Sequence, residues 1–288
     1  MLSGELAALG TATCWSFTGL FFAEAARRVG ALRVNLMRLP VALALAAAGG
    51  SLSALDGRRV AWLAASGVVG LVIGDLALFE AMRRIGPRLA LLVMSTAPIW
   101  ASLAGLLALG ERPGRLALLG IAVTLAGVTW VVGERRAGES YGAHETMGVA
   151  LAAVGAACQG LGLVLAKIGM AGEVPALAAT WVRMGTATGA IWLLTALAGR
   201  ARHVSPVEAA RAAGLPILGG AFFGPFLGVW LSLVAARLTE VGVAATIMAT
   251  TPVLVIPILA VSEGYRPTAR ALVGTAVTVA GVALLFAR

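Results

Sequence analysis

The sequence predicts an all-α integral membrane protein with ten transmembrane helices, arranged as two inverted five-helix repeats around a central cavity. Three observations lead to this fold class: the composition, an internal duplication, and an odd number of apolar segments in each half. Of the 288 residues, 60% are hydrophobic and 12% are charged, and the mean hydropathy is +0.95. A soluble chain carries roughly a quarter charged residues. Half that share, spread between long apolar runs, is typical of a polytopic membrane protein.

The internal duplication is clearest in two segments that begin and end with glycine. Gly120-Ile-Ala-Val-Thr-Leu-Ala-Gly127 is nearly repeated as Gly274-Thr-Ala-Val-Thr-Val-Ala-Gly281, at an offset of 154 residues. The glycines of each segment share one face of a helix, where a neighbouring backbone can approach closely. We therefore assign Gly120, Gly127, Gly274 and Gly281 a structural role and expect the two segments to pack together.

Ten apolar segments are long enough to cross a membrane, which takes roughly 20 residues in a helix. Five fall in each half, so the second half enters the membrane in the opposite sense to the first. Inverted repeats form many secondary transporters, with the substrate site near the midplane between the halves. The segments are 4–24, 33–50, 60–79, 88–109 and 115–132, then 147–167, 176–198, 212–233, 241–261 and 269–286.

The domain boundaries follow from the polar stretch in the middle of the chain. We assign a first repeat to residues 1–132, a linker to 133–146 and a second repeat to 147–288. The first apolar segment is interpreted as a retained helix rather than a signal peptide, because Glu5 stands where a signal peptide carries positive charge. The two halves are expected to form two inverted bundles.

The order of prolines, glycines and charged residues is the same in the two halves. Pro98 is followed by Leu-Gly-Glu-Arg-Pro at 109–113, and Pro252 by Ser-Glu-Gly-Tyr-Arg-Pro at 262–267. Arg38 and Arg183 stand early in the second helix of each half. With the paired glycines, these motifs resemble the EamA repeat of the drug/metabolite transporter superfamily, which includes exporters of amino acids. One departure is an insertion of two residues after Glu263.

The sequence predicts no enzyme, cofactor or metal site. The two histidines, His144 and His203, lie far apart, and there is no Walker loop or hydrolase elbow. Transport would therefore draw on a gradient. The net charge of +9 is spread over single or paired arginines, which suits an anionic lipid surface and not a nucleic acid. We expect a lipid bilayer and a small-molecule substrate as partners, and expect a monomer to suffice.

Asp75 is the clearest ionisable residue inside a predicted span, about six residues or roughly 9 Å past its middle. Its repeat position holds Val229, so the fold itself does not need the charge. Two interpretations stay open: a site for a proton or a substrate amine that faces the cavity, or an anchor paired with an interfacial arginine. Arg38 and Arg183 occur in both halves, which favours a structural role for them.

Aromatic and hydroxyl side chains fall on the helices that, by the family resemblance, surround the central cavity. Packing in the core or against lipid is the alternative for each aromatic residue. Pro225, Pro252 and Pro257 make the eighth and ninth helices candidates for bending. We predict a substrate cavity lined by Trp15, Asp75, Phe79, Thr96, Trp100, Gln159, Phe223, Trp230, Thr246 and Thr250.

These observations favour a transporter in a bacterial-type inner membrane that exports small metabolites, first of all amino acids, by alternating access. The alternatives are efflux of cationic drugs or sugar-type metabolites, and a non-transporting sensor or structural protein. Two arguments disagree on orientation. The resemblance implies cytoplasmic termini, whereas arginines in the loops after odd-numbered spans outnumber those in the other loops. We expect cytoplasmic termini, because the resemblance covers the whole chain.

Overall fold

Helices make up nearly all of the described chain. The computed structural model describes residues 2–47, 55–132, 145–172, 174–199, 205–262 and 267–287, and no strand occurs in these ranges. Seven helical segments there are long and apolar enough to cross a membrane. The all-helical membrane fold is thereby confirmed, whereas ten spans stay a prediction. Most of the predicted linker, the loop insertion after Glu263 and both histidines lie outside the described residues.

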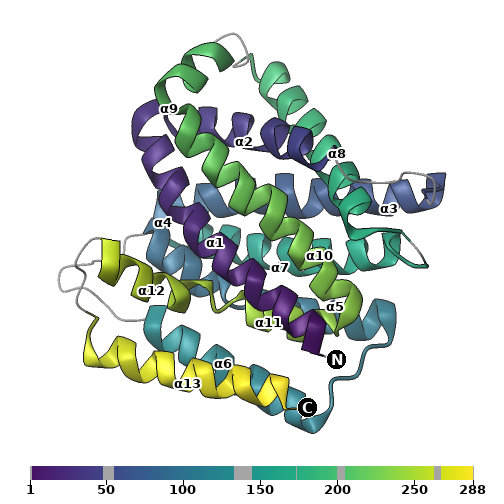
Figure 1. The fold of residues 1–288 in the computed structure, drawn as a ribbon, viewed down its shortest axis with the longest axis vertical. Coiled ribbons are helices and arrows are strands. Elements are labelled where there is room, and N and C mark those ends of the chain that lie inside the picture. Colours follow the sequence, from purple (N-terminus) through teal and green to yellow (C-terminus); the bar gives the residue numbers. More distant parts are fainter. Residues whose placement is uncertain are drawn as a thin grey trace.

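The chain forms matching series of helices in its two halves (Figure 1). The first half holds α1 (Leu2–Val29), α2 (Ala31–Ala46), α3 (Gly57–Gly67), η1 (Val68–Gly74), α4 (Asp75–Met94), α5 (Ala97–Leu109) and α6 (Arg115–Val132). The second holds α7 (Glu145–Gly169), α8 (Ala176–Leu197), α9 (Pro206–Ala221), η3 (Phe222–Gly228), α10 (Val229–Leu238), α11 (Val241–Met248), α12 (Thr251–Ser262) and α13 (Ala269–Phe286).

Two π-helical segments, η1 and η3, interrupt the third and eighth predicted spans. Their bounds are 154 residues apart, which is the offset of the duplicated glycine segments. In η3 the bend was predicted from Pro225, which lacks an N–H and cannot make the regular helical hydrogen bond. η1 contains no proline, and its glycines instead lie against other helices: a Cβ at Gly70 would be 3.7 Å from the Cα of Gly162. Such segments often mark functional sites in helices.

The fourth and ninth predicted spans are also broken at equivalent places. Thr96 lies between α4 and α5, and its repeat mate Thr250 lies between α11 and α12. Each hydroxyl donates a hydrogen bond to the carbonyl three residues earlier, at 2.7 Å in both cases. A further interruption is Gly86 in α4, whose φ of 77° favours glycine. Each of these two spans is still one helical segment of membrane length, Leu89–Leu109 and Val241–Ile258, with a local break inside each, at Thr96 and at Thr250.

Each half packs mainly on the other half. The segments α3, η1 and α4 lie on α7 and α8, while their counterparts α9, η3 and α10 lie on α1 and α2. At the centre α2 packs on α8, and α5 packs on α7 and α11. The two repeats are thus interwoven in space (Figure 1). This arrangement corrects the expectation that each half forms a bundle of its own.

The duplicated glycine segments lie together in the pair formed by α6 and α13, which run side by side in Figure 1. A Cβ at Gly127 would lie 2.5 Å from the backbone nitrogen of Thr278 and 2.8 Å from the carbonyl oxygen of Gly274. At Gly120 it would lie 3.1 Å from the carbonyl oxygen of Gly281. Because these neighbours are backbone atoms, only glycine allows the two helices to approach this closely.

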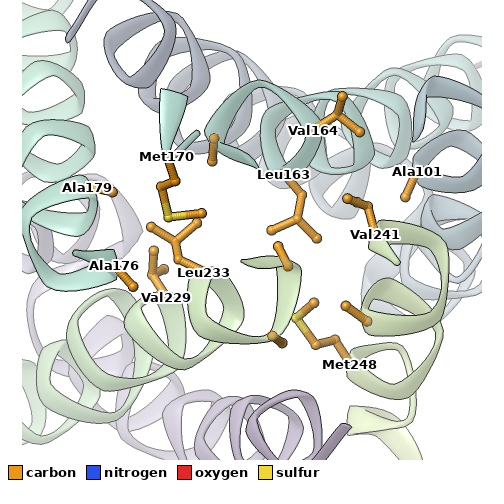
Figure 2. Packing of buried hydrophobic residues seen from close by; sticks show 14 of the residues in the cluster. Ala101, Leu163, Val164, Met170, Ala176, Ala179, Val229, Leu233, Val241 and Met248 are labelled. Carbon is orange, nitrogen blue, oxygen red and sulfur yellow. The ribbon is translucent and has the colours of Figure 1, made fainter. Parts of the chain in front are cut away.

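The largest buried apolar cluster lies between the two halves and takes residues from helices of both, for example Leu36 and Leu63 of the first and Leu163 and Leu233 of the second. Figure 2 shows Leu163 and Met170 of α7, Leu233 of α10 and Met248 of α11 directed toward one another, with Ala101 of α5 at the edge. Leu233 is fully buried, and Met170 and Met248 are nearly so. This part of the space between the halves is therefore filled by side chains.

Candidate functional site

An ion pair inside the membrane region is the centre of the candidate site. Asp75, the first residue of α4, pairs with Arg38 of α2, and the two side chains are only 16% and 12% exposed. Asp75 lies three to four residues past the middle of the helical span Gly57–Gly86, about 5 Å along its axis. An unpaired charge there would cost at least about 2.5 kcal/mol, which explains the pairing. Of the two interpretations of Asp75, the structure agrees with an arginine partner, but this arginine is itself inside the protein and not at the interface.

Two further groups fix the guanidinium of Arg38. Its Nε donates a 2.8 Å hydrogen bond to Oδ1 of Asn35, one helical turn earlier. The ring of Phe79 lies 5.5 Å and the ring of Phe22 5.9 Å from its central carbon, which permits cation–π attraction. Phe79 is 40% exposed, so one side of the ion pair is bordered by an accessible aromatic face.

A second arginine, from the other half, is buried against η1, the segment that leads into Asp75. Arg183 of α8 is 5% exposed. Its side chain lies on η1, where a Cβ at Gly70 would be 3.4 Å from one of its terminal nitrogens. Neither its Nε nor its NH1 has a hydrogen-bond partner among the described residues. Of the two repeat-related arginines, Arg38 therefore holds the carboxylate of Asp75, and Arg183 lies on the helical segment that precedes it.

A separate aromatic cluster lies between α1 and η3. The ring of Phe223 stacks on Phe21 at 6.0 Å and lies 5.7 Å from Phe17 and 5.2 Å from Phe222. Phe222 in turn lies 5.7 Å from Phe226. Glycines make room for these rings, since a Cβ at Gly219 would lie 2.9 Å from Phe21. Rings from both halves therefore gather between α1 and η3.

The predicted tryptophans and Gln159 lie on separate helices. Trp15 of α1 packs on the bare backbone of Gly228 at the end of η3, and Trp230 of α10 packs against the main apolar core. Gln159 is half-buried on α7, whereas Trp100 of α5 is 40% exposed. Within the described ranges, none of these four residues forms a hydrogen bond, ion pair or ring contact with the Arg38–Asp75 pair.

The three predicted threonines do not present a free hydroxyl proton to a solute in this conformation. Thr246 and Thr250 are buried, and Thr246 donates to the carbonyl of Gly242 at 2.7 Å. Thr96 and Thr250 donate to their own helices at the two breaks described above. Each of these hydroxyls therefore stabilises its own helix in this conformation, and their place in the lining of a cavity stays a prediction.

A polar network at one end of the molecule also joins the two halves. Lys167 of α7 pairs with Oε1 of Glu111 at 2.7 Å and donates to the carbonyl of Thr239 at 2.7 Å. The other oxygen of Glu111 accepts the backbone N–H of Val241 at 2.7 Å, and Thr239 donates to Glu5 at 3.2 Å. Glu111 and Lys167 thus connect α5 and α7 with the segment between α10 and α11.

Sequence analysis missed Asn35 and Phe22 as partners of Arg38. The spacing of Asn35 and Arg38 was a usable signal, because residues three apart lie on one helix face. Phe22 belongs to another helix, and nothing in the linear order placed it there. Phe17 and Phe21 were missed for the same reason.

Fold and site together define a multi-pass membrane protein built from two interwoven helical repeats. A family model described as EamA-like transporter family matches residues 2–133 and 146–287. The chain belongs to this family, of the drug/metabolite transporter superfamily, and the resemblance predicted from the sequence is confirmed.

One solved structure, titled "Crystal structure of protein", has a similar fold. It superposes with a TM-score of 0.81 at 20% sequence identity, covering 99% of this chain and 96% of that one. At this identity the likeness shows the fold alone. A search among curated proteins finds no match.

Proposed function

We propose that this EamA-family protein exports small metabolites, most of all amino acids, by alternating access across a bacterial-type inner membrane. The observation that carries the proposal is the pair of π-helical segments, η1 and η3. They lie at the repeat offset, and each packs on the first two helices of the opposite half. A transporter with inverted repeats changes state when the halves exchange conformations, and paired irregular segments are suitable places for that exchange.

The proposed span count is ten, with helices broken at Thr96 and Thr250. On this count both termini lie on one side, which we place in the cytoplasm. In Figure 1 the two termini lie at the same end of the helices. The predicted cavity would lie beside the Arg38–Asp75 ion pair, where Phe79 is accessible.

The chemistry of the site supports a zwitterion with an apolar side chain. The ion pair offers one group of each charge, and the rings on α1 and η3 offer apolar surface. Efflux of organic cations is less well supported, because Arg38 and Arg183 oppose the single charge of Asp75. A cation would enter a site that already carries excess positive charge.

A flux assay tests the proposal. The purified protein is reconstituted in liposomes, and a panel of labelled amino acids, sugars and organic cations is loaded and followed under imposed ion gradients. We expect saturable flux of one or more amino acids. Empty liposomes, and liposomes carrying the protein with η3 altered by Pro225→Ala, serve as controls for leak and for the role of the irregular segment. Flux of sugars or cations alone would overturn the amino-acid assignment, and no flux of any solute would favour a sensor or structural protein.

A further inference from the structure

Arg183 has chemistry that the proposed transport cycle leaves unused. Its side chain is almost completely buried, yet the N–H groups on Nε and NH1 have no acceptor within the described ranges. A guanidinium is always charged, and removing it from water without hydrogen-bond partners is costly. Packing alone would be served by an apolar residue at this position. The arginine therefore indicates a partner that binds there during function.

Among the described residues, no protein anion accepts a hydrogen bond from these N–H groups. The adjoining backbone is bare glycine: Gly70 of η1 faces a terminal nitrogen of Arg183, and Gly67, the last residue of α3, faces the carbonyl oxygen of Arg183 itself. The hydroxyl of Thr186 donates to Val182, so it is committed to its own helix. The carboxylate of Asp75 is held by Arg38 and makes no hydrogen bond to the Nε or NH1 of Arg183 in the described part of the chain.

Charge counting gives the sign of the missing partner. Arg38 and Arg183 contribute two positive charges, and Asp75 contributes one negative charge. In a low-dielectric interior this excess is stabilised by an anion, and arginine binds carboxylates with short, charge-assisted hydrogen bonds. One carboxylate would neutralise the group, whereas a dianion would reverse its sign.

We propose that Arg183 binds the carboxylate of the transported solute, beside the Arg38–Asp75 ion pair. The inference rests on the proposed transport function and narrows its substrate class to small solutes with one carboxylate. The amino group of a zwitterion would lie toward Asp75, and its apolar part toward Phe79. Arg183 is closed to solvent in this conformation, so the solute reaches it when the halves rearrange.

Three related molecules distinguish recognition of the carboxylate from recognition of the amine and the apolar part of the solute. Leucine carries both charged groups, isoamylamine is leucine without its carboxylate, and 4-methylpentanoate is leucine without its amine. Binding to the purified full-length protein at low chloride is measured as a concentration-dependent rise in the thermal unfolding temperature. We expect leucine and 4-methylpentanoate to stabilise the wild type and isoamylamine to have no effect.

Substitution at Arg183 tests the residue itself. In Arg183→Gln the apparent affinity for both acids should fall by about tenfold to a hundredfold, the range for one charged hydrogen-bonding partner. Arg183→Lys keeps the charge and should retain part of the affinity. Arg211→Gln, which removes an exposed arginine from α9, is the matched control and should bind as the wild type does.

Three outcomes of the binding experiments would overturn the inference. Equal stabilisation by isoamylamine and leucine, or none by either acid, removes the carboxylate from recognition. Unchanged affinity in Arg183→Gln would show that the arginine is structural. If chloride stabilises the wild type as much as 4-methylpentanoate does, and both effects are lost in Arg183→Gln, the site binds an inorganic anion. If Arg183→Gln does not fold, Arg183→Lys and the ligand series on the wild type decide. Liposome flux is measured in parallel: flux without carboxylate preference refutes this inference alone, and absence of all flux refutes the proposed function.

Discussion

Replacing Gly127 by alanine tests the close approach of α6 and α13. The added methyl carbon would lie 2.5 Å from the nitrogen of Thr278 and 2.8 Å from the carbonyl oxygen of Gly274. These are backbone atoms of α13, so no side chain can rotate away and the helices must separate. Overpacking of this kind costs about 1–3 kcal/mol. Alanine has a higher helix propensity than glycine, which offsets this cost by about 1 kcal/mol.

A matched glycine isolates the packing contribution. Gly189 lies in α8 with nothing within 4 Å of a built Cβ, so Gly189→Ala should show only the propensity gain. The two variants should therefore differ by about 1–3 kcal/mol, which is the overpacking alone. Thermal unfolding in detergent, followed by tryptophan fluorescence, should place Gly127→Ala several degrees below Gly189→Ala. Equal unfolding temperatures would refute the role assigned to this contact.

Four further predictions concern the ion pair, the polar network, accessibility and orientation. Asp75→Asn leaves Arg38 unpaired and should lower the free energy of unfolding by about 3–5 kcal/mol, seen as poor recovery of monodisperse protein. Adding Arg38→Gln should improve that recovery. A stable single variant that also keeps the wild-type pH dependence of transport would contradict both the anchoring role and the proton-coupling role of Asp75. Glu111→Gln should weaken the network that joins the halves and lower the unfolding temperature, and an unchanged temperature would show that the network adds no stability. With the native cysteines replaced, a cysteine at Phe79 should react with small aqueous thiol reagents faster than a cysteine at Thr250. Equal rates would contradict the finding that Phe79 is exposed and Thr250 is buried. A green fluorescent protein fused to the C-terminus should fluoresce, whereas activity of a fused periplasmic phosphatase would reverse the orientation.

The sequence was sufficient for the fold class and for the duplication. Composition and the repeated segment at Gly120 and Gly274 predicted a helical membrane protein of two repeats. The same offset relates η1 to η3 and Thr96 to Thr250, but these irregularities were not predicted in the first half. Proline gave a local signal in η3, whereas η1 bends without one. Transferring the expected bend across the repeat would have found it.

The candidate site was harder to predict, because its contacts join distant segments. Asp75 was selected by its charge alone, and its partner Arg38 comes from a helix 37 residues earlier. Periodicity shows which face of a helix is apolar, but not which helix covers it. The interwoven packing of the halves is likewise invisible in linear order. Phe79 is exposed and Thr250 is buried because of that packing.

Interwoven repeats also impose an order on synthesis and assembly. When the first half leaves the ribosome, α3, η1 and α4 have not yet met α7 and α8, against which they pack in the finished protein. The Arg38–Asp75 pair can form early, since both residues belong to the first half, but Arg183 reaches it only after α8 is made. Such non-local contacts form late and slow folding. Each half produced alone would therefore lack most of its native neighbours, and the two produced together in one cell could complete one another.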